Sequence, residues 1–291
     1  MKVSGFTFLR NGQKLGYPFV ESIRSILPIV DEFVIALGPC DDDTESMLRA
    51  IGDPKIRIIP TRWNERIRPD YSVKGFVYGQ QKSLALFNCT GDWAFYLEAD
   101  EVVHESDLPK IRAAMEKHLD DPQVEALAFD YLHFYGNANT YAWSPRWYRS
   151  EVRIIRNTIP AWGPEGLFFV VLDTHRRGRY PRAAHTGASI YHYGWVRSES
   201  QMDLKASAVH KFWKNEQLPA IDYSRVDPET LKLFTGTHPQ TMQAWLPKAA
   251  GIFRTDPNYR VSRREKKHRL MLKLEKWFGF RFNKKHYTLV R

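Results

Sequence analysis

Cysteine is scarce in this chain of 291 residues, which contains Cys40 and Cys89 and no others. Two cysteines cannot supply a disulfide framework or a zinc site of the usual four-ligand kind, and they are typical of a reducing compartment. Long apolar runs are also missing. The N-terminal segment lacks the apolar core of a signal peptide, and no stretch approaches the roughly 20 apolar residues of a membrane-spanning helix. We therefore expect a cytoplasmic protein.

Excess charge is missing from most of the chain. Residues 260–291 contain twelve Lys and Arg and two Glu, so this segment accounts for the whole net charge of +10. The body shows no basic patch in its sequence, and we do not expect nucleic acid as a partner. Hydrophobic residues make up 43% of the chain, which is enough for a substantial core.

Apolar runs and helical patterns alternate along the N-terminal part of the chain. The strand-like runs lie at residues 3–9, 33–37, 56–59 and 93–97, with helical spacing between them. Such alternation is typical of an α/β fold with a mostly parallel central sheet flanked by helices. We expect one domain over residues 1–199. The rest, 200–291, is expected to form a mainly helical C-terminal extension.

The fourth of these runs ends in a cluster of carboxylates. Trp93-Ala-Phe-Tyr-Leu is followed by Glu98, Asp100 and Glu101. Open α/β sheets bind ligands beyond the carboxyl ends of their strands. Carboxylate oxygens suit Mg²⁺ or Mn²⁺, which keep coordination positions free for substrate phosphates. The sequence therefore predicts a divalent-metal site at this edge, although the two glutamates can also be read as caps of the next segment or as partners of basic residues.

The order of several short motifs resembles the family 2 glycosyltransferases with a GT-A fold, especially bacterial enzymes that build lipopolysaccharide or other surface glycans. The matching pieces are Arg10-Asn11, Asp31-Glu-Phe-Val-Ile, Asp43-Thr44, Gly91-Asp-Trp, Glu98-Ala-Asp100-Glu101, Trp162-Gly-Pro-Glu165-Gly and Ile190-Tyr-His192-Tyr-Gly-Trp-Val-Arg197. They span about residues 3–200. The resemblance implies metal-dependent, inverting transfer of a sugar from a nucleotide-sugar donor to a glycan or lipid-linked acceptor.

Two positions depart from the pattern of that family. Its acidic motif is usually Asp-x-Asp, and here Glu98 replaces the first Asp. The resemblance makes Asp100 the principal metal ligand and places Glu98 near the ribose, the metal or its waters. Many relatives have an Asp at the end of the second strand that contacts the base, where this chain has Leu37-Gly38. The nucleotide base is therefore not assigned.

The resemblance also implies a late histidine in the metal shell. His192 fits that place, while His175 and His185 lie nearby in the sequence. A lone histidine is also commonly a structural hydrogen-bonding residue, so both interpretations of His192 stay open.

Glu165 is the candidate general base, with Asp130 and Asp173 in reserve. It lies in a glycine-flanked loop that can place a carboxylate at the sheet edge, within reach of an acceptor hydroxyl. A hydrogen bond to a local backbone N–H is the alternative role for this side chain.

Donor binding is assigned to basic and polar residues around the expected site. Arg10 and Asn11 end the first strand, Lys82 precedes the acidic strand, and Arg197 follows the late one. These residues can approach the nucleotide or its diphosphate, with Glu98 beside them. Ordinary surface or loop positions are the competing interpretation for each.

Aromatic residues cluster between residues 131 and 148. Tyr135, Trp143 and Trp147, with Arg146, form the predicted acceptor site, because aromatic rings suit the apolar faces of sugars and Arg suits acidic groups. The same rings can equally belong to the core.

The basic segment 260–291 has an apolar stripe. Leu270, Leu274 and Trp277 share one helical face. A basic amphipathic helix with aromatic residues is typical of a peripheral contact with an anionic membrane surface. The alternative is a helix that packs on the body and leaves a solvated basic face.

Two further functions remain open from the sequence. A nucleotidyltransferase also places acidic residues and a metal beside a nucleotide. A catalytically idle glycan- or membrane-binding protein would account for the replaced Asp at position 98 and for the missing base-contacting Asp.

Overall fold

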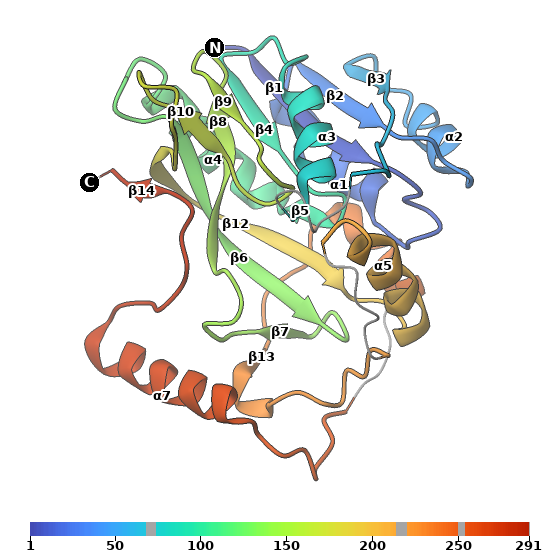
Figure 1. Cartoon of the computed structure of the whole chain (residues 1–291), viewed down its shortest axis with the longest axis vertical. Coiled ribbons are helices and arrows are strands. Elements are labelled where there is room, and N and C mark those ends of the chain that lie inside the picture. Colours follow the sequence, from blue (N-terminus) through green and yellow to red (C-terminus); the bar gives the residue numbers. More distant parts are fainter. Residues whose placement is uncertain (68–73, 214–219, 250–253, 291) are drawn as a thin grey trace.

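Four parallel strands form the N-terminal half of the central sheet. The computed structural model describes residues 1–67, 74–213, 220–249 and 254–290. In spatial order the four strands are β3 (Ile56–Pro60), β2 (Glu32–Leu37), β1 (Val3–Leu9) and β4 (Trp93–Tyr96). These are the four runs predicted as strands, and that prediction is confirmed. Their carboxyl ends meet at one edge of the sheet (Figure 1).

Helices cover both faces of this half. The helices α1 (Phe19–Ile26) and α4 (Leu108–Lys117) lie on one face, and α3 (Phe76–Leu86) lies on the other (Figure 1). Successive side chains of a strand point to opposite faces. Within β2, Ile35 accordingly packs in the cluster of α1 and α4, whereas Val34 packs in the cluster of α3. The predicted α/β architecture with helices on both sides of a sheet is confirmed.

The second half of the sheet is mixed. β8 (Ser150–Arg156) runs antiparallel to β4 and to β6 (Ala126–Tyr135). β12 (Arg182–Trp195) runs parallel to β6 and antiparallel to β5 (Glu101–Val103). Because β5 follows the turn after β4, its pairing with β12 brings that long strand beside the acidic cluster.

The other elements are mostly short. They are α2 (Thr44–Arg49), β7 (Thr140–Ala142), β9 (Ala161–Trp162), β10 (Val170–Leu172), β11 (Gly178–Arg179), α5 (Glu199–His210), β13 (Leu231–Leu233), α6 (Leu246–Ala249), α7 (Arg263–Phe278), β14 (Thr288–Leu289) and the 3-10 turns Leu27–Ile29, Glu105–Asp107, Pro228–Thr230 and Gln240–Met242. Strands β9, β10 and β11 form a separate three-stranded sheet.

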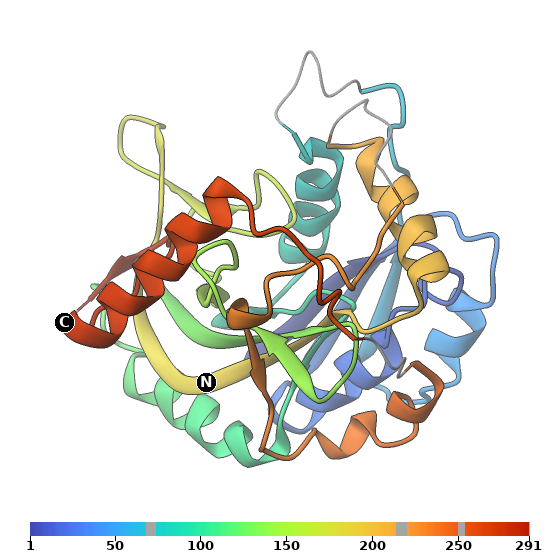
Figure 2. The same cartoon turned by 90° about the horizontal axis from the view of Figure 1, so that it is seen from below.

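The C-terminal segment lies along the outside of the body. α7 lies at the lower edge of the molecule in Figure 1 and in front of the sheet in Figure 2, and β14 then pairs with the start of β12. An ion pair joins Glu275 of α7 to the buried Arg149 of the body. The boundary expected near residue 199 stays a prediction. Within the described ranges, no helix has the length and apolar character needed to cross a membrane.

Candidate functional site

A cavity of about 410 Å³ lies beyond the carboxyl ends of β1 and β4. Five residues predicted for the site from the sequence line it together: Arg10, Asn11, Glu98, Asp100 and His192. The strand order explains their meeting, because β1, β4 and β12 all end or pass at this edge. Chain positions as distant as 10 and 192 therefore contribute to one site.

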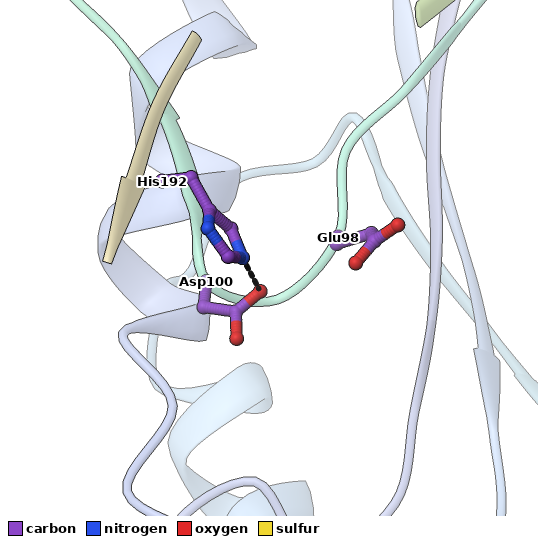
Figure 3. Close-up of side chains that lie close together, drawn as sticks. All are labelled: Glu98, Asp100 and His192. Atoms are coloured by element: carbon purple, nitrogen blue, oxygen red, sulfur yellow. Dashed lines mark ion pairs between the residues drawn. The ribbon is translucent and has the colours of Figure 1, made fainter. Parts of the chain in front are cut away.

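Glu98, Asp100 and His192 form a candidate metal centre. The chain turns directly after β4, and both carboxylates belong to that turn, while His192 lies on β12 opposite Glu101 of β5. One potential ligand atom from each of the three residues lies within 4.8 Å of the others. Figure 3 shows the His192 ring directed at Asp100, with Glu98 farther along the turn. Two carboxylates and an imidazole are a donor set that fits Mn²⁺ or Mg²⁺.

Asp100 lies beside two cationic side chains and the ring of His192. Its Oδ2 accepts a hydrogen bond from Nζ of Lys205 at 2.7 Å, and Nη2 of Arg197 lies 3.8 Å away. On the other oxygen, Nε2 of His192 lies at 3.6 Å. Although burial raises it, these positive neighbours hold the pKa of Asp100 well below its usual range. Asp100 is therefore ionised at neutral pH. Lys205, which the sequence did not single out, is its nearest cation.

A second histidine orients His192. Nε2 of His133 lies 2.6 Å from the backbone carbonyl of Tyr148, which can only accept, so this nitrogen carries a proton. Burial and the neighbouring His192 hold the pKa of His133 well below its usual value, so its Nδ1 is bare. That nitrogen accepts from Nδ1–H of His192 at 2.9 Å. In the neutral ring of His192 the lone pair then lies on Nε2, the atom facing Asp100. This arrangement is the one that metal-ligating histidines need.

Glu98 has a different environment. Nη2 of Arg153 donates to it at 3.1 Å, and the same guanidinium makes two bonds of 2.7 Å to the fully buried Glu101. Burial raises the pKa of Glu98 to about 8, and Glu101 adds to the effect while Arg153 opposes it. The two carboxylates of the candidate centre thus hold different protonation states at neutral pH. Sequence spacing gave no sign of Arg153, which reaches the site from β8.

Aromatic rings also line the cavity. Trp63, Tyr78, Phe212 and Trp213 line it, with Trp63 and Tyr78 in edge contact at 5.3 Å between centroids. The Trp63 ring also fills the space beside Gly38. A Cβ placed on Gly38 would lie 2.5 Å from its indole nitrogen, so a larger side chain at this position would clash with the ring. The indole N–H has no hydrogen-bond partner among the described residues.

Lys82 does not line the cavity. Its buried ammonium donates to the carbonyls of Gly166, Leu167 and Phe168 at 3.1, 3.2 and 3.1 Å. These three hydrogen bonds therefore hold the loop that carries Glu165 in place. A role at the donor phosphates stays a prediction for this residue, but these bonds favour the structural interpretation.

Arg197 is not among the residues that line the cavity, although it lies beside Asp100, which does line it. It is 1% exposed, and its Nη1 donates to the carbonyl of Leu15 at 2.6 Å. Its Nε and Nη2 have no hydrogen-bond partner among the described residues, and Nη2 is the atom 3.8 Å from Asp100. Two nitrogen donors of this buried guanidinium thus have no acceptor among the described residues beside the candidate metal centre.

Glu165 lies in the loop before β10; it is not among the residues that line the cavity, although its neighbour Gly166 is. Burial raises the pKa of Glu165, with His286 and Lys82 opposing the shift. A raised pKa is expected of a general base that works near neutral pH. Its assignment as the base stays a prediction.

The sequence alternatives to His192 and Glu165 lie elsewhere. Asp130 and His185 lie beside each other at 3.7 Å, and Asp130 also pairs with Arg281 at 2.9 Å. Asp173 and His175 belong to the connection between β10 and β11. None of these four lines the cavity.

The predicted acceptor residues lie away from the cavity lining. Tyr135 and Trp147 pack in a cluster with Trp195 and Tyr223. This packing favours the alternative that these rings belong to the core. Trp143 carries Lys232 over its ring at 4.2 Å and Arg149 at 4.7 Å. Arg146 follows Trp143 closely in the same segment. A role of Tyr135, Trp143, Trp147 and Arg146 in acceptor binding stays a prediction.

Comparison with known proteins gives partial structural likenesses. Searches against protein-family models and against curated proteins find no match. Among solved structures, glucosyl-3-phosphoglycerate synthase from Mycobacterium tuberculosis, in complex with Mn²⁺, uridine-diphosphate and phosphoglyceric acid, is 21% identical with a TM-score of 0.33, covering 45% of this chain and 43% of that one. S. aureus TarS 1–349 is 14% identical with a TM-score of 0.37, covering 54% and 47%. The chain thus spans less than half the length of each, and the function proposed below rests on the site itself.

Proposed function

We propose that this protein is a metal-dependent, inverting glycosyltransferase that moves a sugar from a nucleotide-sugar donor to a glycan or lipid-linked acceptor. The observation that carries the proposal is the convergence of Glu98, Asp100 and His192 in one cavity, with His133 fixing the lone pair of His192 toward Asp100. A cavity lined by a candidate carboxylate–imidazole metal centre and by aromatic rings suits a nucleotide diphosphate. The aromatic rings would hold the base, and the metal centre would hold the diphosphate.

The chemistry divides among the residues of the site. A bound divalent cation supplies charge neutralisation for the leaving diphosphate. Asp100, Glu98 and His192 would hold that cation, and Arg197 and Arg10 would contact phosphate or ribose oxygens. Glu165 would take the proton of the acceptor hydroxyl. At the same time, the acceptor oxygen would bond to the anomeric carbon while the bond from that carbon to the diphosphate breaks.

The first test measures binding and transfer separately. Thermal shifts with nucleoside diphosphates and nucleotide sugars, with and without Mn²⁺, identify the base, since a ligand of the folded state raises the melting temperature. Asp100→Ala should remove the metal-dependent shift, whereas Asp120→Ala, at an exposed position outside the cavity, should retain it. Exchange of diphosphate without sugar transfer would instead favour a nucleotidyltransferase. The absence of any shift would favour an idle glycan- or membrane-binding protein.

The same proposal includes an anionic membrane surface as a partner, bound through α7. Leu270, Trp277 and Phe278 of this helix are 56%, 74% and 66% exposed. The two acidic residues of α7 are each bonded to other protein groups. Glu265 is bonded to Tyr259 and Ser262, and Glu275 is paired with Arg149.

The side chains of α7 that are exposed are therefore apolar or basic. The exposed bases are Arg263, Arg264, Lys266, Lys267, Lys273 and Lys276. Such a surface fits insertion of Trp and Phe at the headgroup level, together with attraction of the bases to anionic lipid. A peripheral location of this kind would bring the cavity to a lipid-linked acceptor.

Vesicle sedimentation tests this partner. The protein should bind phosphatidylglycerol vesicles and leave phosphatidylcholine vesicles unbound. Phe278→Ala should weaken the binding, while Phe87→Ala, which removes an equally exposed ring (67%) at the end of α3, should not. Equal losses in the two variants would contradict the assignment of α7 as the contact surface.

A further inference from the structure

The cation that holds Asp100 in this structure is the side chain of Lys205. Lys205 lies on α5 and lines the cavity. Its ammonium donates to Oδ2 of Asp100 at 2.7 Å and to the carbonyl of Gly194 at 3.2 Å, and it lies 5.0 Å from the ring centroid of Tyr17. A lysine thus occupies one oxygen of the residue that would be the principal metal ligand.

An ammonium ion and a divalent cation cannot both bind closely to the same carboxylate oxygen without strong repulsion, because their charges would lie only a few ångströms apart. If a metal ion uses Oδ2 of Asp100, the ammonium of Lys205 must move. The lysine stem is unbranched and has four rotatable bonds, so the ammonium can swing while α5 stays in place.

A second observation points to where the ammonium would go. Arg197 lies directly beside the same carboxylate, and its Nε and Nη2 are buried donors without hydrogen-bond partners among the described residues. A buried guanidinium with two unfilled donors fits a ligand with several acceptor oxygens, and a phosphate is such a ligand. Lys205 and Arg197 thus lie on one side of Asp100, where they can share one anion.

We propose that Lys205 is an exchangeable cation, which neutralises Asp100 while the site is empty and transfers to the donor diphosphate, beside Arg197, when metal and donor enter together. The proposal rests on the proposed function, since it names a further ligand of the same donor. It implies that the protein binds free metal ion weakly, because the ammonium must be displaced. It also implies that diphosphate and metal promote the binding of each other.

Direct binding measurements on the intact protein test the exchange. Lys205→Met removes the charge and keeps an unbranched stem, and Lys205→Arg keeps the charge. Mn²⁺ binding without any nucleotide, followed by electron paramagnetic resonance, should become at least about tenfold tighter in Lys205→Met. Binding of Mg²⁺–pyrophosphate, followed by calorimetry, should become at least about fivefold weaker. Lys205→Arg should stay near wild type in both measurements.

A matched control uses another lysine–aspartate pair. Lys110 donates to Asp107 at 2.7 Å, the same distance, but lies outside the cavity, so Lys110→Met should change neither affinity. Unchanged or weaker Mn²⁺ binding by folded Lys205→Met would overturn the exchange. If Asp100→Ala then still lost Mn²⁺ binding, the proposed metal site would stand without the exchange. If Asp100→Ala bound Mn²⁺ like wild type, the metal site itself would fail.

Discussion

Replacement of Arg153 by Met removes the buried cation that is bonded to Glu98, to Glu101 and to the backbone of Leu167. Its guanidinium makes bonds of 2.7 Å to each carboxylate oxygen of Glu101 and one of 2.8 Å to the carbonyl of Leu167, besides its contact with Glu98. Met retains a comparable apolar stem. Arg153 and Glu101 are both 0% exposed, so no water can replace the lost partner without a change in packing.

The expected fall in the free energy of unfolding depends on the groups that lose Arg153 as a partner. Removal of one partner from a buried ion pair costs about 3–5 kcal/mol, because the other charge is left without compensation. Glu101 keeps hydrogen bonds from Tyr131 and from the backbone of Glu98, at 2.9 and 3.0 Å, which soften the loss. The carbonyl of Leu167 loses one donor but keeps its hydrogen bond from Lys82 at 3.2 Å, so it adds little to the loss. We expect the free energy of unfolding to fall by about 4 kcal/mol, a large share of the roughly 5–15 kcal/mol typical of a folded protein.

Urea denaturation measures this change. Arg112→Met is the matched control: Arg112 is half exposed and bonded to Glu116 at 3.0 Å, and such surface pairs contribute about 0–1 kcal/mol. Glu101→Gln, combined with Arg153→Met, removes the orphaned charge but keeps an acceptor, so the double variant should recover about 2 kcal/mol. A loss below about 1 kcal/mol in Arg153→Met, or no recovery in the double variant, would refute this reasoning.

Three further predictions concern the metal centre and the base. Because burial raises the pKa of Glu98 to about 8, this carboxyl group is mostly protonated at neutral pH and must lose its proton to bind a cation. Mn²⁺ affinity should rise by up to about tenfold per pH unit below that pKa and level off above it; a flat profile in a binding titration would exclude Glu98 as a ligand. His133→Phe should weaken Mn²⁺ binding by about 10–100-fold, because His192 loses the partner that orients it, and equal binding by the variant and wild type would contradict that role. Glu165→Gln should keep donor affinity in the thermal-shift panel but slow sugar transfer by about 10²–10⁴-fold; a fully active variant would place the base elsewhere.

The sequence predicted the framework of the site because the framework follows short-range patterns. Apolar runs of strand length indicated the parallel strands, and the rule that ligands bind at carboxyl ends placed Glu98 and Asp100 at one edge. His192 came from the resemblance to a family. Its closeness to Asp100 depends on β12 pairing with β5, which no local pattern reveals.

The sequence could not assign the polar residues that come from other elements. Lys82 was expected near phosphates, yet α3 has buried residues on nearly all sides, so its periodicity does not tell which way a polar side chain points. Lys205, His133 and Arg153 belong to three different elements with no shared motif. Lys205 reaches Asp100, Arg153 reaches Glu98 and His133 reaches His192, and this convergence is a property of tertiary packing alone.

The charges of the site also bear on the order in which ligands enter. Around the candidate metal centre, Arg153, Arg197 and Lys205 are positive, Asp100 and Glu101 are negative, and Glu98 is mostly protonated at neutral pH. Three cations thus face two ionised carboxylates. A centre with this balance attracts an anion more strongly than a bare divalent cation. A metal ion that arrives on a diphosphate brings its own counter-charge, and the loss of the Glu98 proton then gives it a further ligand. The same residues that weaken the binding of free metal therefore favour the metal–diphosphate complex.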